Sequence, residues 1–189
     1  MPLTDYETLY YIREGIQNIN NPFIKAMVKE QEYSITKHGG LDPYAIGFYI
    51  APFINATIRV GTALDKEMLF RSMLERFGND LVPSGKRGHK GELVPLAEET
   101  CRVCANVKSR QTKLRDDNLL VIEKLIEEQN LLENKIVAVK LPKELGMDKN
   151  ILGLIANILM DKYQRPILLL NEITETINDK PKKAWAGSA

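Results

Sequence analysis

Residues Tyr44 to Gly61 read YAIGFYIAPFINATIRVG and form the most apolar segment of the chain. From Ala45 to Ala51 the side chains are almost all apolar, which is typical of a β-strand that is buried on both faces. Pro52 has no amide hydrogen to donate to a neighbouring strand. We therefore expect the strand to end at Pro52 and to continue as a shaped loop.

Polar and apolar residues alternate after this proline, at Asn55, Thr57 and Arg59. A guanidinium group that lies beside a hydrophobic core is costly unless it is paired. Arg59 is therefore expected to meet a carboxylate, backbone carbonyls or a ligand phosphate. The sequence leaves these alternatives open.

Helices are expected on both sides of this segment. Thr4 and Glu7 have the spacing of a capping box, Asn20–Pro22 would end one helix and start another, and Thr62 with Asp65 forms a second capping box. The residues expected on the inner faces of these helices are Leu9, Ile12, Ile16, Ile19, Phe23, Met27, Tyr33, Leu64, Met68 and Met73.

Residues 77–95 are expected to form a loop, because glycines and prolines interrupt any regular pattern there. Its centre carries Lys86, Arg87 and Lys90. The spacing of a P-loop is absent, and no strand-to-helix pattern surrounds the loop. The segment is either a solvated surface loop or a basic finger that lies over phosphates.

No proline or glycine occurs from Leu96 to Gln129, which predicts one long helix. The first half of this helix is basic and includes Lys108 and Arg110. Cys101 and Cys104 lie within it without the further ligands that a zinc site needs, so we expect them to pack between helices. The apolar residues expected on one face of the second half are Leu119, Ile122 and Ile126.

The pattern changes after Asn134. Residues 135–141 alternate as a strand does, Asp148 can cap a helix, and residues 166–170 form an apolar strand. This order predicts a β-α-β unit with parallel strands. A polar turn at 178–181 and a last strand at 183–189 complete the expected fold.

Composition places the chain among ordinary globular proteins. It has 189 residues, a hydrophobic fraction of 44% and a formal net charge of +1. A basic site must therefore be local. No apolar run reaches the length of a membrane span, no signal peptide is visible, and two cysteines suit a reducing compartment. We expect a cytoplasmic protein with no membrane partner.

Four groups of residues follow a known pattern. They are PFINATIRVG (52–61), NVKSRQ (106–111), ILGLIAN with YQRP (151–157 and 163–166) and WAGSA (185–189). In this order they resemble the RecJ-like single-strand exonucleases of the DHH phosphoesterase superfamily, whose first segment reads P-R-I-N-A-A-G-R. Phe53 and Ile58 depart from that segment, where the family has arginine and glycine.

The resemblance implies an α/β fold in three parts. Residues 1–95 would be a mainly helical region with a buried strand that follows the catalytic DHH domain and contains the basic loop 77–95. Residues 96–130 would be a connector helix. Residues 131–189 would be a small β-α-β DHH-associated domain, expected to be incomplete.

The resemblance also implies an activity for the intact enzyme, which removes nucleotides from the five-prime end of single-stranded DNA in repair and recombination. Family members bind a pair of metal ions through aspartates and histidines. No DHH or D-x-D motif occurs here. We therefore expect manganese or magnesium only in the intact enzyme, and no activity from this chain alone.

By position in the family pattern, Arg59 would steady a phosphate near the metals and Asn55 would shape its loop. The expected partners are single-stranded DNA and the missing catalytic domain, with the chain forming one wall of the strand groove. The residues that the resemblance assigns to nucleic-acid binding are Asn55, Arg59, Lys86, Arg87, Lys90, Lys108, Arg110, Gly187 and Ser188.

Other classes of function stay open at this point. The chain could be a stand-alone module, without catalysis, that binds nucleic acid or docks a partner. It could also belong to a phosphodiesterase acting on short oligonucleotides or cyclic dinucleotides, or be an assembly module with no nucleic-acid role. An unpaired strand edge near 183–189 could let the fragment form homo-oligomers.

Overall fold

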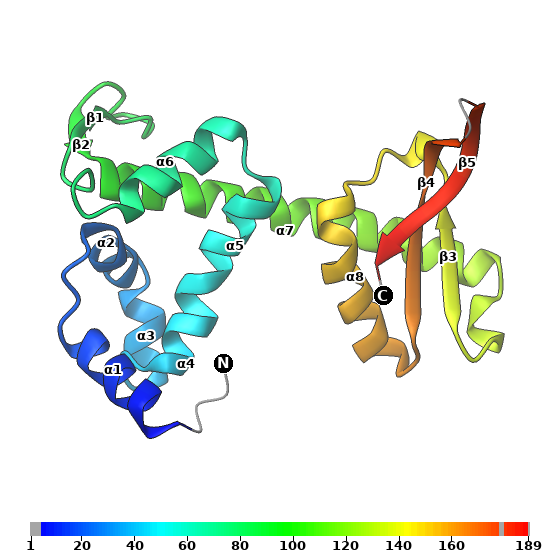
Figure 1. The fold of residues 1–189 in the computed structure, drawn as a ribbon, viewed down its shortest axis with the longest axis horizontal. Coiled ribbons are helices and arrows are strands. Elements are labelled where there is room, and N and C mark those ends of the chain that lie inside the picture. The colour runs from blue at the N-terminus through cyan, green and yellow to red at the C-terminus, as the bar shows by residue number, and fades with distance from the viewer. Residues whose placement is uncertain (1–4, 178–179, 189) are drawn as a thin grey trace. The chain divides into compact units, whose positions relative to one another are not determined.

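The structure, a computed structural model, describes residues 5–177 and 180–188; for residues 175–177 and 180–182 it describes the backbone alone. The chain divides between Ser109 and Arg110 into two compact units, which we call unit 1 and unit 2 (Figure 1). The long helix α7 (Leu96–Glu128) contributes its first part to unit 1 and its second part to unit 2.

Unit 1 is mainly helical. A short antiparallel hairpin precedes α7, and residues 46–50 form a π-helix, η1, in which hydrogen bonds reach five residues along the chain. The elements before α7 are α1 (Tyr6–Gln17), α2 (Pro22–Glu30), α3 (Glu32–His38), α4 (Pro43–Ala45), η1 (Ile46–Ile50), α5 (Ala51–Val60), α6 (Ala63–Met73), β1 (Leu81–Pro83) and β2 (Leu93–Pro95).

The core of unit 1 forms where α2, η1, α6 and the start of α7 meet. Cys101 and Cys104 are buried in it as free thiols, which confirms that they pack between helices. Burial raises the pKa of both thiols, so neither is a reactive thiolate at neutral pH. The core residues are Phe23, Met27, Ile50, Leu69, Ala97, Cys101 and Cys104.

The prediction of a buried strand at the start of Tyr44–Gly61 is wrong. The segment is helical throughout, and α4 and α5 run on as one rod (Figure 1). Pro52 is the second residue of α5 and follows the π-helix η1 directly, so the continuous helix accommodates it at the junction of the two helix types. An apolar run fits a strand or a helix equally well. Here one helical face is buried and the other is exposed.

Several details of the expected helices also change. Asp5 caps α1 by accepting a hydrogen bond from the Thr8 amide, and Thr4 lies outside the described residues. The Thr62–Asp65 capping box of α6 is confirmed. The inner face of α6 is formed by Leu69 and Ser72. Three residues expected to face inward are exposed instead: Tyr33, Leu64 and Met73.

The loop expected at 77–95 contains regular structure at both ends. Val82 pairs with Val94 in the β1–β2 hairpin, so only residues 84–92 form the irregular tip. Short apolar strands of three residues were hidden by the surrounding glycines and prolines. The hairpin gives the basic tip a fixed base.

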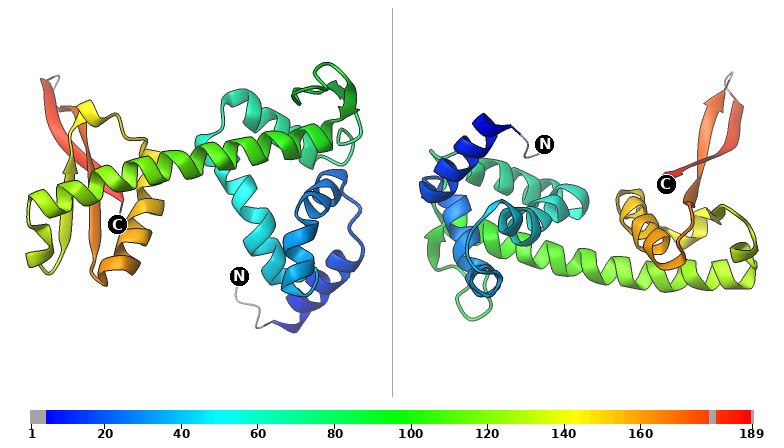
Figure 2. Two further views of the ribbon diagram at one scale, coloured as in Figure 1. Left: turned by 180° about the vertical axis from the view of Figure 1, so that it is seen from behind. Right: turned by 90° about the horizontal axis from the view of Figure 1, so that it is seen from below.

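Unit 2 contains the predicted β-α-β arrangement. Its sheet has the order β3-β4-β5, with β3 parallel to β4 and β5 antiparallel to β4. Helix α8 packs against β4 and β5 (Figure 2). The elements are η2 (Leu131–Glu133), β3 (Val137–Leu141), η3 (Lys143–Leu145), α8 (Lys149–Tyr163), β4 (Ile167–Ile177) and β5 (Lys180–Ser188).

Local sequence explains the limits of these elements. The Asp148 side chain caps α8 by accepting a hydrogen bond from the Asn150 amide, and Gln164 ends the helix in a left-handed conformation. Arg165 then donates to the carbonyls of Leu132 and Asn134, which ties the helix end to η2. Of the polar turn expected at 178–181, residues 178–179 lie outside the described residues, and Pro181 belongs to β5, where it pairs with Thr176 of β4.

The core of unit 2 combines α7, α8 and the sheet. Strand β3 alternates buried and exposed residues, as predicted. No helix in the described part of the chain is long and apolar enough to cross a membrane. The large side chains that are fully buried here are Ile122, Ile126, Leu141, Ile151, Leu152, Ile155, Leu159 and Leu169.

Two phenylalanines give a matched test of this fold. Phe23 is fully buried and Phe48 is 62% exposed. Phe23→Ala should lower the free energy of unfolding by about 3–5 kcal/mol, because it leaves a cavity in the core of unit 1. Phe48→Ala should lower it by only about 0.5–1.5 kcal/mol, because this exposed ring loses its contacts with Tyr44 and Tyr49 but leaves no cavity. Urea unfolding followed by circular dichroism measures both, and equal losses would contradict the helical assignment of residues 46–60.

Candidate nucleic-acid interface

The tip of the hairpin presents three cations to solvent. Lys86, Arg87 and Lys90 are all exposed. Backbone hydrogen bonds close the tip: the Ser84 amide donates to the Glu92 carbonyl at 2.8 Å, and the Gly91 amide donates to the Ser84 carbonyl at 2.8 Å. Gly91 has a φ of 89°, which favours glycine. The turn is therefore specified by sequence, and its three basic side chains are exposed, with Lys86 also lining a hollow beneath the tip.

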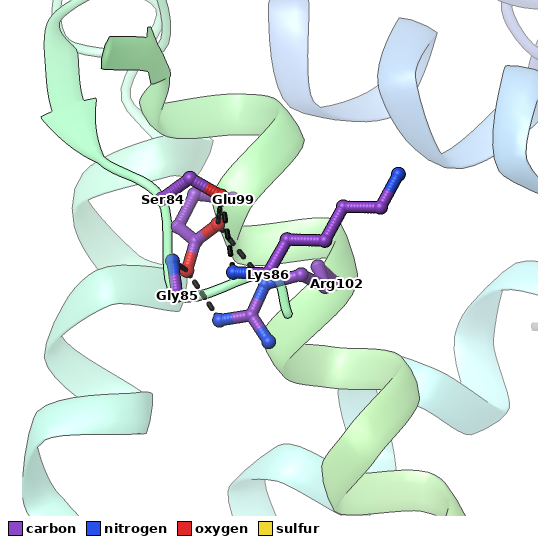
Figure 3. Close-up of polar contacts among 5 residues, drawn as sticks. All are labelled: Ser84, Gly85, Lys86, Glu99 and Arg102. Atoms are coloured by element: carbon purple, nitrogen blue, oxygen red, sulfur yellow. Dashed lines mark hydrogen bonds and ion pairs between the residues drawn. The ribbon is translucent and has the colours of Figure 1, made fainter. Parts of the chain in front are cut away.

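Glu99 of α7 anchors the base of this tip (Figure 3). Its carboxylate accepts a hydrogen bond from the Gly85 amide at 3.0 Å, and the Arg102 guanidinium donates to it through two N–H groups. The Ser84 hydroxyl donates to the same carboxylate at 3.4 Å and accepts from the Lys86 amide at 3.1 Å. This network joins the loop to the helix, which the sequence alone does not reveal.

The charge of Glu99 is stabilised by these contacts. Burial by itself would raise the pKa of the carboxyl group. The hydrogen bonds from Arg102, from the Gly85 amide and from the Ser84 hydroxyl outweigh burial and hold the pKa below its ordinary value. Glu99 is therefore an anion at neutral pH. We call its hydrogen bonds with Gly85, Ser84 and Arg102 the Glu99 clamp, because they hold the loop against α7.

A hollow of about 600 Å³ lies beneath the tip. Its lining mixes charges, with Lys86 and Arg102 facing several carboxylates. A phosphate would meet repulsion inside this hollow, so the part of the hairpin suited to an anion is the exposed tip. The charged residues of the lining are Lys29, Glu30, Glu32, Lys86, His89, Glu92, Glu98, Glu99 and Arg102.

Asn55 and Arg59 lie on the solvent face of α5, and both are exposed. The expectation that Arg59 must be paired beside a core is wrong, because the helix carries its side chain into water. Arg59 is in the last turn of α5, where a cation also suits the helix dipole. Its role toward a phosphate stays a prediction.

Lys108 and Arg110 lie on either side of the boundary between the units. Lys108 is half-buried in the last part of unit 1, and Arg110 is exposed at the start of unit 2. Both side chains make contacts within the protein. Their predicted role in nucleic-acid binding stays a prediction.

Gly187 is required by the sheet itself. A Cβ atom at this position would overlap the Leu169 carbonyl of the neighbouring strand, so no other residue fits without moving β5. Ser188 lies close to α8, where a Cβ on Gly153 would lie 2.9 Å from its hydroxyl oxygen. These contacts give both glycines a structural role, whatever they do for a ligand.

Gly187 and Ser188 also line a cleft of about 800 Å³ in unit 2. The start of α8 borders the same cleft with Lys149 and Asn150, and Lys143 approaches from η3. Sequence reasoning missed these neighbours, because only the fold of β5 against α8 brings them together. A capped helix start that follows a lysine-rich turn is the signal that could have pointed to them.

The described residues, 5–177 and 180–188, contain no group of three or more histidine, cysteine or acidic side chains that could hold a metal ion. The donors that a two-metal hydrolase needs are therefore not assembled in this part of the chain. No chemical step is routed here through a metal held by these residues.

Comparison with known proteins identifies what the chain resembles. No protein-family model matches it. Two curated relatives are 37% identical over 174 residues, or 92% of this chain: the YorK protein of the SPbeta prophage in Bacillus subtilis (strain 168), and the yorK product of Bacillus phage SPbeta. Both carry names that describe candidate single-strand DNA-specific exonucleases. The chain spans 29% of the length of these relatives.

Two solved structures share the fold. RecJ in complex with Mn²⁺ from Thermus thermophilus has a TM-score of 0.57 at 20% identity, over 85% of this chain and 20% of that one. An exonuclease RecJ bound to manganese has a TM-score of 0.60 at 19% identity, over 90% of this chain and 36% of that one. The chain thus has the mixed α/β fold of a part of RecJ. The resemblance to RecJ-like proteins that its motifs indicate is confirmed.

Glu99→Gln tests the clamp. The substitution should lower the free energy of unfolding at pH 7 by about 1–3 kcal/mol, because it weakens buried hydrogen bonds to an ion. Glu99 has a lowered pKa in the folded state, so its stabilising effect is present above its ordinary pKa of 4.5 and is lost as the pH falls through the folded value. The difference between native and variant should shrink on acidification.

Glu98→Gln is the matched control, since Glu98 is exposed one residue earlier on the same helix. Amide exchange gives a local measurement, because the Gly85 N–H should exchange faster in the Glu99 variant alone. Equal stability of both variants at pH 7, with Gly85 unchanged, would contradict the clamp.

Proposed function

We propose that the chain is the nucleic-acid-binding part of a RecJ-like single-stranded DNA exonuclease, and that a catalytic domain outside this sequence performs the hydrolysis. The observation that carries the proposal is the 37% identity to YorK over 92% of the chain, from relatives more than three times as long. In this proposal, residues 1–95 form the region that follows the catalytic domain, and residues 131–189 form the DHH-associated domain. Residues 96–130 form the helix that connects these two parts. The expected place of action is the cytoplasm, in DNA repair and recombination.

The basic tip is the first surface we assign to the DNA strand. Three exposed cations within five residues can neutralise neighbouring phosphates, and the hydrogen bond from Gly85 to Glu99 keeps them from collapsing onto the protein. Contacts to phosphates carry no base preference and depend strongly on salt. Such a tip positions a strand without selecting its sequence.

The cleft in unit 2 is the second surface. Gly187 is exposed and lines the cleft, and the Ser188 hydroxyl can donate to a phosphate oxygen. Lys143 and Lys149 line the same cleft, and its two carboxylates are already engaged, since Asp148 caps α8 and Glu172 pairs with Lys183. We assign to this cleft the role of one wall of the strand groove. Asn55, Arg59, Lys108 and Arg110 complete the proposed contacts.

A triple substitution tests the proposal. Replacing Lys86, Arg87 and Lys90 by alanine should weaken binding to a single-stranded oligonucleotide at low salt. It should also reduce the slope of log affinity against log salt by about 2, since each phosphate contact contributes about 0.7 on single strands. Fluorescence anisotropy across a salt series measures both quantities for native and variant chains.

A control with the same change in charge is available in unit 1. Arg13, Lys37 and Lys66 are exposed and lie outside the hairpin, and replacing them by alanine should leave the salt slope near the native value. Equal effects of the two triple variants would show that net charge alone accounts for the binding, and would contradict a specific role of the tip. Absence of single-strand binding by the native chain at low salt would refute the proposed function.

A further inference from the structure

An exposed column of aromatic rings lies where α3 meets α4 and η1. His38 stacks on Tyr44 with ring centroids 4.8 Å apart and planes 23° apart. Tyr44 stacks on Phe48 at 4.9 Å and 9°. Tyr49 packs edge-on against both His38 and Phe48. We call His38, Tyr44 and Phe48 the aromatic column.

The column is open to solvent. Tyr44 is 52% exposed and Phe48, at the end of the column, is 62% exposed. Packing in the core therefore does not account for the parallel stack. Rings that lie nearly parallel and accessible present a flat π surface, which is the geometry that a nucleobase needs for stacking.

The column continues along one face of a helix. From Tyr44 to Arg59 the exposed positions include Tyr44, Phe48, Asn55 and Arg59, at helical spacing, whereas Ala45, Ile50, Ala56 and Thr57 are buried. Arg59 lies 11 residues after Phe48, which corresponds to about 16 Å of helix at about 1.5 Å per residue. Aromatic rings and a guanidinium thus share one face.

The charge on this face suits a phosphate backbone. Arg59 is the only charged residue from Pro43 to Gly61. The nearest carboxylates along the chain are engaged at helix starts: Asp42 caps α4 and lies 3.4 Å from His38, and Asp65 completes the α6 capping box. A cation further along the same helix as exposed rings can bind the phosphate backbone of a strand whose base stacks on the rings.

We propose that the aromatic column is a stacking platform for a nucleobase of a single DNA strand, with Arg59 binding a backbone phosphate of the same strand. The proposal rests on the proposed function and adds base contacts to it. Stacking tolerates any base, because every base has a flat face, so the platform would hold a strand of any sequence.

Phe48→Ala should weaken binding to a single-stranded oligonucleotide at least about fivefold, since a base stacked on an aromatic ring contributes at least about that factor. An oligonucleotide with 2-aminopurine at one position should show quenched fluorescence on the native chain and less quenching on the variant. Phe48→Leu should lose as much affinity for the oligonucleotide as Phe48→Ala does, whereas Phe48→Trp should keep the native affinity. Tyr33→Ala, in an 80% exposed tyrosine elsewhere in unit 1, is the control and should change nothing.

An abasic strand of equal length separates base contacts from phosphate contacts. The native chain should bind it more weakly than the normal strand, and Phe48→Ala should bind the two strands equally. Native affinity in Phe48→Leu would show an apolar surface suited to a protein partner and would overturn the platform. Strand binding that neither Phe48→Ala nor base removal weakens would also overturn it, while leaving the basic tip in place. If the native chain binds no single strand at all, the proposed function on which the platform rests would be refuted instead.

Discussion

Both units depend on the burial of apolar side chains along α7. This helix of 33 residues contains neither glycine nor proline, so it can supply one wall of a core at each of its two ends. Cys101, Cys104 and Val107 are buried in unit 1, and Ile122 and Ile126 are buried in unit 2. A break in α7 would remove packing partners from both cores. Glu99 on this helix also holds the hairpin tip, through its hydrogen bond from the Gly85 amide.

Positive charge in this protein is local and fixed in place. A formal net charge of +1 gives no general attraction for nucleic acid, so binding must come from small groups of cations in set positions. The buried Glu99 carboxylate shows how one such group is held, because a single anion joins the loop backbone at Gly85 to the helix through Arg102. A buried charge is tolerated when several donors surround it. In this way unit 1 uses a buried anion to position the basic tip that we propose as a binding surface.

The structure follows the sequence where periodicity is unambiguous. The alternation in β3, the cap at Asp148 and the helical spacing in α8 predicted the β-α-β unit, and the absence of helix breakers predicted α7. The apolar run before Arg59 did not decide between strand and helix, and the π-helix shifts its spacing by a residue. The polar residues Asn55 and Arg59 are four positions apart, as residues on one face of a helix are. This spacing was the sequence signal that favoured a helix. The Glu99 clamp joins residues 14 apart and needs the hairpin, and the lysines beside Gly187 need the sheet, so local pattern could show neither.

Chemical-shift mapping would test the central claim, that the chain itself binds a single strand through fixed local surfaces. A uniformly labelled chain of 21.4 kDa would be titrated with a short oligothymidylate and with a duplex of equal length. The account predicts amide shifts that saturate with the single strand at residues 85–90, along 44–59 and at 187–188, and weaker shifts with the duplex. Shifts that avoid all three segments, or that are the same for both DNAs, would contradict it.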